Sequence, residues 1–134
     1  MAQAILLPLF EKGDFQPSDV FGVVGTKSSV KRVKDRLPNG IHVFSSDDPN
    51  SFEVWQMPVQ LLAIKPQQLE ALDRSLNQSH SLTSKSNKRP LLISLLAGVT
   101  LQRLRRSFPK HSLVRAVPNT PALVSAGITG LTWG

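Results

Sequence analysis

The sequence predicts an α/β fold in which helices cover both faces of a parallel β-sheet. Short apolar segments alternate along the chain with helical patterns. Each of these segments is continuously apolar rather than alternating, which is typical of parallel strands buried on both faces. The 134 residues are enough for one hydrophobic core but not for two complete ones. The predicted strands cover residues 20–24, 41–44, 59–64, 91–95 and 112–117.

The predicted helices are marked by capping residues and by prolines. Ser28, Asp48 and Thr100 stand where a side-chain oxygen would accept a hydrogen bond from the first helical turn. Pro49 and Pro66 stand at first helical positions, where the missing N–H costs nothing. The predicted helices and helical turns cover residues 1–10, 29–37, a short segment from 49, a segment from 66 to about 76, 101–108 and 121–126.

Two of these helices, the one from Pro66 and the one over 101–108, have a clear apolar face. In the helix from Pro66, leucines recur at i, i+3 and i+7. Residues 77–89 are polar without a period and predict a surface loop. Residues 128–133 predict a final extended segment. The residues expected to point inward are Leu69, Leu72, Leu76, Leu101, Leu104 and Phe108, and the arginines expected to point mostly outward are Arg103, Arg105 and Arg106.

The composition excludes several classes of protein. The absence of cysteine excludes a disulfide scaffold, a thiolate metal site and a cysteine nucleophile. His42, His80 and His111 lack metal-like spacing, so we expect no metal. The longest apolar runs fall well short of the roughly 20 residues that span a bilayer. The N-terminus lacks the basic start and cleavage site of a signal peptide. We therefore expect a cytoplasmic protein that does not bind a membrane.

The chain is strongly basic, with a formal net charge of +7 and a pI of about 10.4. This excess favours partners that carry phosphate, such as a nucleic acid, an anionic lipid or a phosphorylated cofactor. The alternative interpretation is that the basic side chains form a solvated surface without such a partner. No aromatic residues are interleaved with the basic ones, as they are in proteins that stack single-stranded bases.

In open parallel sheets, ligands bind beyond the carboxyl ends of the strands. The residues that follow the predicted strands are glycine, proline, small polar or basic residues, which allow backbone amides to approach phosphate and ribose oxygens closely. As bare spacings these turns are weak signals. The segments concerned are 26–29, 45–48, 63–66, 96–98 and 118–121.

Three of these segments together are more specific. Ala63-Ile-Lys-Pro-Gln67, Ile93-Ser-Leu-Leu-Ala-Gly-Val-Thr100 and Val114-Arg-Ala-Val-Pro-Asn-Thr-Pro-Ala122 closely resemble motifs of pyrroline-5-carboxylate reductase, and their spacing matches. The start of the chain, Met1-Ala-Gln-Ala-Ile5, is similar to the segment that follows that family's glycine loop. The resemblance implies a Rossmann-type domain that binds NADP(H) or NAD(H). It also implies transfer of a hydride to the C=N bond of 1-pyrroline-5-carboxylate, which yields L-proline.

The resemblance also implies which residues contact the cofactor. Residues 63–66 match the segment beside the nicotinamide ribose, and residues 95–97 match a turn under the nicotinamide, where two leucines depart from the family's small residues. Asn50 matches an asparagine that often contacts the cofactor. No side chain is an obvious proton donor, so the catalytic residues stay unknown. The expected cofactor-binding residues are Thr26, Lys27, Ser28, Asn50, Ala63, Ile64, Lys65, Pro66, Leu95, Leu96, Ala97, Asn119 and Thr120.

The turn after residue 24 favours NADP over NAD. An NAD site usually ends its second strand with a carboxylate that holds the ribose 2′-hydroxyl. Here no carboxylate follows Val24 until Asp35. Thr26, Lys27 and Ser28 stand at a helix N-terminus instead, which favours an anion such as a 2′-phosphate.

Two parts of the resembled family have no counterpart in the sequence. The G-x-G-x-x-G fingerprint and its preceding strand are absent, and so is the helical C-terminal domain, which in that family forms the homo-oligomer and much of the substrate pocket. We therefore expect residues 1–134 to be an incomplete NADP-binding Rossmann domain. Because the absent strand is central in this sheet order, strand 20–24 is expected either to lie a strand's width from strand 59–64 or to pair with it. The chain alone is expected not to reduce pyrroline-5-carboxylate.

Two other functions compete with a reductase. The first is a remnant that binds a nucleotide without catalysis. The second, which the sequence favours least, is a basic nucleic-acid-binding protein. Two observations suggest this function: the net charge and the basic run within residues 27–36. That run also suits a cofactor phosphate.

Overall fold

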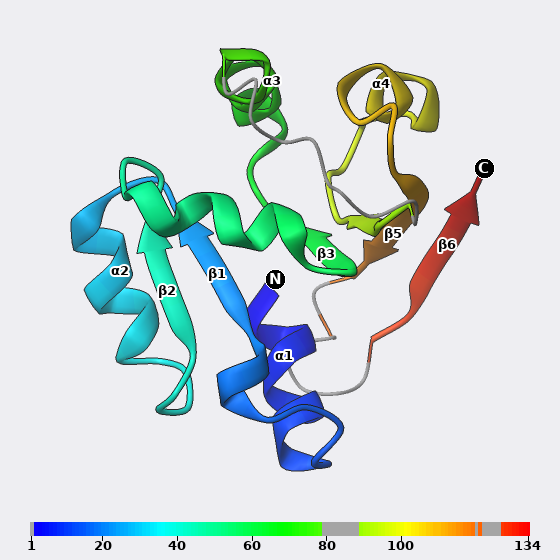
Figure 1. The fold of residues 1–134 in the computed structure, drawn as a ribbon. Helices are drawn as coiled ribbons and strands as arrows, with labels where there is room; N and C mark the ends of the chain where they lie inside the picture. Colours follow the sequence, from blue (N-terminus) through cyan, green and yellow to red (C-terminus); the bar gives the residue numbers. More distant parts are fainter. Residues whose placement is uncertain (1, 79–88, 120, 122–126) are drawn as a thin grey trace. The chain divides into compact units, whose positions relative to one another are not determined.

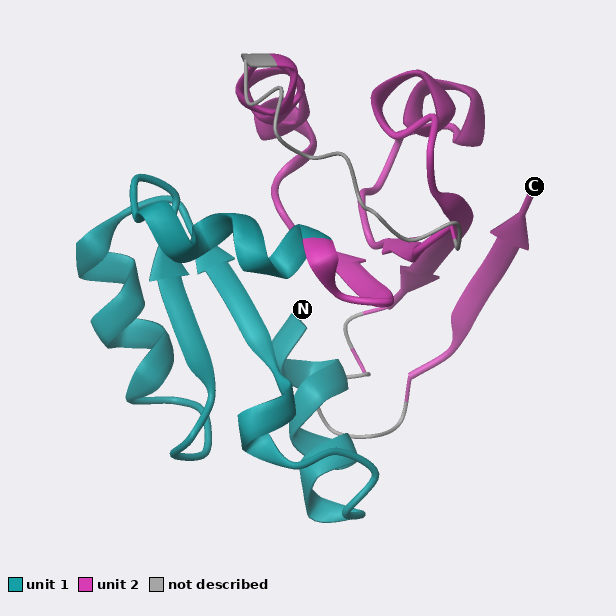
Figure 2. Cartoon of the chain, viewed as in Figure 1, with its two compact units in different colours: residues 1–55 teal, residues 56–134 magenta. Residues whose placement is uncertain are grey.

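The computed structural model describes residues 2–78, 89–119, 121 and 127–134. The chain forms two compact units, residues 1–55 and residues 56–134 (Figure 2). Each unit contains its own β-sheet (Figure 1). The predicted α/β class is confirmed, but the predicted strands are divided between two sheets.

The first unit is built on two parallel strands. The residues of β1 and β2 pair in register from Phe21 with His42 to Val24 with Ser45. The rings of Phe21 and His42 stack with their centroids 4.6 Å apart, which adds a cross-strand contact to the ladder. The elements are α1 (Ala2–Glu11), a 3₁₀ helix (Pro17–Asp19), β1 (Phe21–Val24), α2 (Lys27–Lys34), β2 (His42–Ser45) and a 3₁₀ helix that begins the passage to the second unit (Pro49–Gln56).

The second unit holds a four-stranded sheet with the order β3-β4-β5-β6. β3, β4 and β5 are parallel, and β6 is antiparallel to β5. α3 and α4, which connect these parallel strands, lie on the same side of the sheet (Figure 1). The elements are β3 (Val59–Leu62), a 3₁₀ helix (Pro66–Gln68), α3 (Leu69–Gln78), β4 (Leu91–Ser94), α4 (Leu101–Ser107), β5 (Ser112–Pro118) and β6 (Thr129–Trp133).

Most of the buried apolar side chains belong to the second unit. Leu104 of α4 is fully buried, as the apolar spacing of that helix predicts. In the first unit the buried apolar side chains of the described residues are Ile41 and Val43. The core of the second unit contains Leu62, Leu69, Leu92, Leu96, Val99, Leu104, Phe108, Leu113 and Ala116.

β1 and β3 belong to different sheets. The described residues of these two strands share no backbone pairing, because β1 pairs only with β2 and β3 only with β4. Direct pairing of strand 20–24 with strand 59–64, one of the two expected arrangements, is therefore excluded. The other expected arrangement, a separation of one strand's width, stays a prediction.

The basic helix begins and ends earlier than predicted. Its N-cap is Thr26 rather than Ser28, because the Thr26 hydroxyl accepts a hydrogen bond from the backbone N–H of Ser29 at 3.3 Å. Three hydroxyl residues stand in this turn, and the extended backbone of Thr26 selects it as the cap. The helix ends at Lys34 instead of near Leu37.

Other predicted boundaries hold to within about two residues, apart from the polar loop at 77–89. Residues 77 and 78 continue α3, and residues 79–88 lie outside the described residues. Of the helical turn predicted over 121–126, only Pro121 is described. The two other predicted caps are confirmed, since Thr100 accepts from the N–H of Arg103 and Asp48 from that of Asn50.

Candidate functional site

In the first unit, the turn after β1 holds three of the predicted cofactor residues. The hydroxyl of Thr26 lies 3.0 Å from that of Ser28 and 2.9 Å from that of Ser29, so these groups are engaged in the start of α2. Lys27 is different, because its side chain is 83% exposed. Lys27 is therefore the side chain of this turn that is accessible to an anion in solution.

The turn after β2 lies against the turn after β1. The Ser46 hydroxyl donates to the carbonyl of Gly25 at 3.0 Å, which ties the two turns together. Asp47 then brings its carboxylate within 3.7 Å of the Lys27 ammonium. The pKa of Asp47 is lowered, chiefly by a hydrogen bond from the Ser45 side chain, with contributions from its own backbone N–H and from Lys27. Asn50 follows in the first turn of the 3₁₀ helix Pro49–Gln56 and is exposed.

This arrangement corrects one premise of the sequence argument. No carboxylate follows Val24 until Asp35 in the sequence, but in the folded chain Asp47 lies beside Lys27. An anion bound at Lys27 would meet this negative charge. The two residues are twenty positions apart, and only the parallel pairing of β1 with β2 brings them together.

In the second unit, the predicted segment at residues 63–66 directly follows β3. Ala63, Lys65 and Pro66 are exposed and Ile64 is half-buried. The backbone N–H of Lys65 donates to the side-chain oxygen of Gln68 at 3.0 Å, and Pro66 opens the 3₁₀ helix. The end of β3 is thereby fixed by its own cap, and the Lys65 ammonium remains in solvent.

The segment at residues 95–97 follows β4, next to the end of β3. The N–H of Leu95 donates to the carbonyl of Leu62 at 2.9 Å, which extends the pairing of the two strands by one bond. Leu96 is 1% exposed and belongs to the core, so only its backbone can contact a ligand. Ala97 is exposed, and Gly98 turns the chain with a φ of 73°, which favours glycine.

The predicted residues after β5 are Asn119 and Thr120. The side-chain oxygen of Asn119 accepts from the N–H of Ile128 at 3.0 Å, and its backbone N–H donates to the Ile128 carbonyl at 3.3 Å. Asn119 therefore closes the connection between β5 and β6, and its side-chain NH₂ stays available as a donor. Thr120 lies outside the described residues.

An open groove of about 470 Å³ lies beyond the carboxyl ends of β3 and β4. Among its lining residues, Pro66 was predicted to bind the cofactor, and Gly98 lies within a segment that was singled out after a predicted strand. The other lining residues lie within five residues of these two and were not predicted to bind a ligand. A smaller hollow of about 150 Å³ beside Gly40 and Ile41 lies at the amino end of β2, where this fold class does not bind ligands. The groove is lined by Pro66, Gln67, Leu69, Glu70, Gly98, Val99, Thr100 and Arg103.

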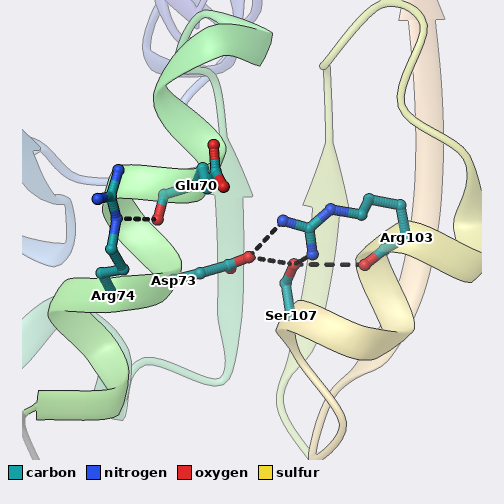
Figure 3. A network of polar contacts seen from close by, with 5 residues as sticks. All are labelled: Glu70, Asp73, Arg74, Arg103 and Ser107. Atoms are coloured by element: carbon teal, nitrogen blue, oxygen red, sulfur yellow. Dashed lines mark hydrogen bonds and ion pairs between the residues drawn. The ribbon is translucent and has the colours of Figure 1, made fainter.

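One wall of the groove carries a network that the sequence did not predict. Arg103 was expected to point outward, but its Nη2 lies 2.6 Å from Oδ2 of Asp73 on α3 (Figure 3). Its Nη1 donates to the Ser107 hydroxyl at 2.8 Å, and that hydroxyl lies 3.0 Å from the same Asp73 oxygen. Asp73 and Arg103 are thirty residues apart, so no local pattern indicates the pair.

The predicted site residues thus form one group in each unit. Thr26, Lys27, Ser28 and Asn50 belong to the first, and the described residues among 63–66, 95–97 and 119 belong to the second. In the described part of the chain, no cluster of His, Asp or Glu suits a metal ion. No helix in that part is long and apolar enough to cross a membrane.

Both groups share one principle: parallel strands whose carboxyl ends carry small, polar and basic residues beside the first turn of the next helix. This defines the class of Rossmann-like α/β nucleotide-binding folds. Solved structures agree with this class. A pyrroline-5-carboxylate reductase from Coxiella burnetii matches 99% of this chain and 46% of its own, with a TM-score of 0.76 and 29% identity. An NADP-bound pyrroline carboxylate reductase from Plasmodium falciparum shares the fold, with a TM-score of 0.56 and 19% identity.

The sequence comparisons point to the same family. The pyrroline-5-carboxylate reductase of Synechocystis is 43% identical over 131 residues, and that of Escherichia coli is 34% identical over 134 residues. Both alignments cover 98% of this chain and 45% of the relative. No model of a protein family matches the chain. The chain is therefore homologous, over almost all of its own length, to pyrroline-5-carboxylate reductases, and it spans a little less than half of their length.

Proposed function

We propose that residues 1–134 provide part of the cofactor site of a pyrroline-5-carboxylate reductase. The activity would be the NADPH-dependent reduction of the C=N bond of 1-pyrroline-5-carboxylate to L-proline, in cytoplasmic proline biosynthesis. The observation that carries this proposal is the convergence of residues 63–66 and 95–97. These two motif segments follow the adjacent parallel strands β3 and β4. The chain continues from them into one groove, which Pro66 lines on one side and Gly98, the residue after Ala97, on the other.

The residues of the second unit suit the redox end of a dinucleotide. Pro66 lines the groove with its apolar ring, and Gly98 lines it with backbone that carries no side chain. Both let a flat ring approach closely. Exposed Ala97 stands beside this backbone, and the NH₂ group of Asn119, at the end of the neighbouring β5, has no partner among the residues that the structure describes. NADPH, when bound, supplies the hydride. The chain's own residues bind and orient the cofactor, and we assign none of them to proton transfer.

The residues of the first unit suit a phosphate, with one restriction. The exposed ammonium of Lys27, at the start of α2, is a suitable partner for a ribose 2′-phosphate. The carboxylate of Asp47 beside it repels such a group. We therefore propose NADP as the cofactor, with a preference over NAD that Lys27 raises and Asp47 lowers.

A chimaera tests the activity. Residues 1–134 replace the matching stretch of the Synechocystis relative, and NADPH oxidation is followed with pyrroline-5-carboxylate as substrate. We expect turnover by the chimaera and none by the 134-residue chain alone, because positioning of both reactants supplies much of the rate. A folded chimaera without turnover would contradict the proposal. Turnover by the chain alone would contradict the expectation that this chain is inactive by itself.

The same chimaera tests the cofactor preference. Lys27→Ala is expected to weaken NADPH binding by about tenfold while leaving NADH nearly unchanged, because one charge-assisted phosphate contact is lost. Asp47→Asn is expected to change the preference in the opposite direction. Isothermal titration with both cofactors measures the two effects. Equal changes for NADPH and NADH in both variants would show that this turn does not contact the 2′-phosphate.

A nucleotide-binding remnant without catalysis is the second candidate. It predicts that the chimaera binds NADPH but does not turn over. The net charge no longer supports the nucleic-acid candidate. The first unit, which contains the basic helix, has six Lys and Arg against seven Asp and Glu, whereas the second has ten against two. The net charge therefore does not come from the unit that contains α2.

A further inference from the structure

The network between α3 and α4 connects the two walls of the groove. One wall comes from residues 66–70, which lead into α3, and the other from residues 98–103, which lead into α4. Asp73 lies one turn into α3, and Arg103 lies in the first turn of α4 (Figure 3). The contact between these side chains therefore spans the two elements that shape the groove.

The geometry of the network is closed. Arg103 uses two different guanidinium nitrogens, one for Asp73 at 2.6 Å and one for Ser107 at 2.8 Å. The Ser107 hydroxyl returns to Asp73 at 3.0 Å, so one carboxylate oxygen collects both contacts. A planar guanidinium holds its nitrogens in a rigid fork that fixes such an arrangement, whereas the ammonium of a lysine is a point charge on a flexible stem.

The partners are also restrained from outside the network. The backbone N–H of Arg103 donates to the capping hydroxyl of Thr100, so both ends of this residue are fixed. The Asp73 side chain is only 16% exposed, and its second oxygen, Oδ1, is buried without a partner among the described residues. Without Arg103, a largely buried carboxylate would lose its counter-charge, which is strongly destabilising. The position of Asp73 on α3 is therefore coupled to the position of α4.

We infer that Asp73 and Ser107 are positioning residues that act through Arg103. They form a clasp, defined as Asp73, Arg103 and Ser107, that fixes the spacing of α3 and α4 and so the width of the groove. The clasp itself rests on the contacts above, whereas its effect on the cofactor rests on the proposed function. Within that function, the clasp keeps Pro66 and Gly98, which line the groove, at the spacing that one ring requires.

Distance measurements on the full 134-residue chain test the clasp. The chain has no cysteine, so Ala71→Cys on α3 and Gln102→Cys on α4 give two unique, exposed positions for spin labels. We expect a single narrow distance distribution by electron paramagnetic resonance. Asp73→Asn should broaden it or move it to longer distances. An unchanged distribution in folded Asp73→Asn overturns the clasp.

Two further variants separate geometry from charge and from folding. Arg103→Lys keeps the charge and should still broaden the distribution, because the shorter, flexible lysine side chain lacks the rigid planar fork that holds both partners. Ser107→Ala is a milder change and should also broaden the distribution, so it replaces Asp73→Asn in the test if that variant does not fold. Glu70→Gln is the matched control, since it is the same chemical change on the same helix in a groove-lining carboxylate that makes no ion pair with the described residues. A broadening in Glu70→Gln as large as in Asp73→Asn overturns the assignment.

The effect on the cofactor is measured separately in the chimaera. Asp73→Asn should raise the KM for NADPH by about tenfold with a smaller change in kcat, because the groove is misshapen while the chemistry is intact. Unchanged KM with a broadened distance distribution would refute the positioning role and leave a structural contact. If the unmodified chimaera has no activity, the proposed function fails, and the distance distributions still decide whether the clasp exists.

Discussion

Replacement of Leu104 by alanine tests whether the apolar face of α4 holds the second unit together. Leu104 has no exposed surface, and the nearby helix residue Phe108 is only 2% exposed. The change removes three carbon atoms, which at about 0.8 kcal/mol each amounts to about 2.4 kcal/mol of lost burial. A cavity that the core cannot close raises the measured loss for such substitutions toward about 5 kcal/mol. Because the surrounding core is almost fully buried, we expect a loss of about 3 to 4 kcal/mol.

Urea denaturation followed by circular dichroism measures this loss. We expect a lower midpoint with an unchanged slope, which indicates a change in stability rather than in the unfolded state. Leu131→Ala on β6 is the matched control, because it is the same chemical change at a side chain that is 61% exposed. The control should alter stability by no more than about 0.5 kcal/mol. If Leu104→Ala cost no more than Leu131→Ala, the assignment of the core would be refuted.

Two further predictions concern the second unit. Thr100→Ala removes the hydroxyl that accepts from the N–H of Arg103 at 3.2 Å, and should lower the free energy of unfolding by about 1 kcal/mol, whereas Thr100→Ser should retain it in the same urea titration. Burial lowers the pKa of His111 below its usual 6.5, so the unfolded chain takes up this proton first and stability should fall as the pH drops below about 6.5. His111→Gln should flatten that dependence in titrations between about pH 7.5 and 5.5, a range above the titration of Asp47. An unchanged slope would contradict the role of His111.

The elements were predictable because their signals are local. Thr100 was identified as a cap, and Leu104 and Phe108 as core, since each depends on residues within one or two helical turns. The error at Ser28 is also local. Thr26, Ser28 and Ser29 all offer a hydroxyl, and the choice is made by where β1 ends.

The contacts that shape the candidate site were not predictable, because they join residues far apart in the chain. The pairs Lys27–Asp47 and Asp73–Arg103 exist only after two parallel strands or two helices have been brought together. The pairing of β6 with β5 was missed for a similar reason: the extended segment was recognised, but its partner and direction depend on the connection that Asn119 closes.

The division of the strands into two sheets has a consequence for the behaviour of the chain in solution. Two separate sheets present four strand edges instead of two, and the β1, β3 and β6 edges carry no charged side chain. Unpaired backbone N–H and C=O groups along such edges are templates for intermolecular pairing, which natural proteins suppress with lysine or proline. On β6 this backbone lies beside Leu131 and Trp133, which are 61% and 75% exposed. Self-association should therefore rise steeply with protein concentration, and a single lysine introduced into β6 should reduce it.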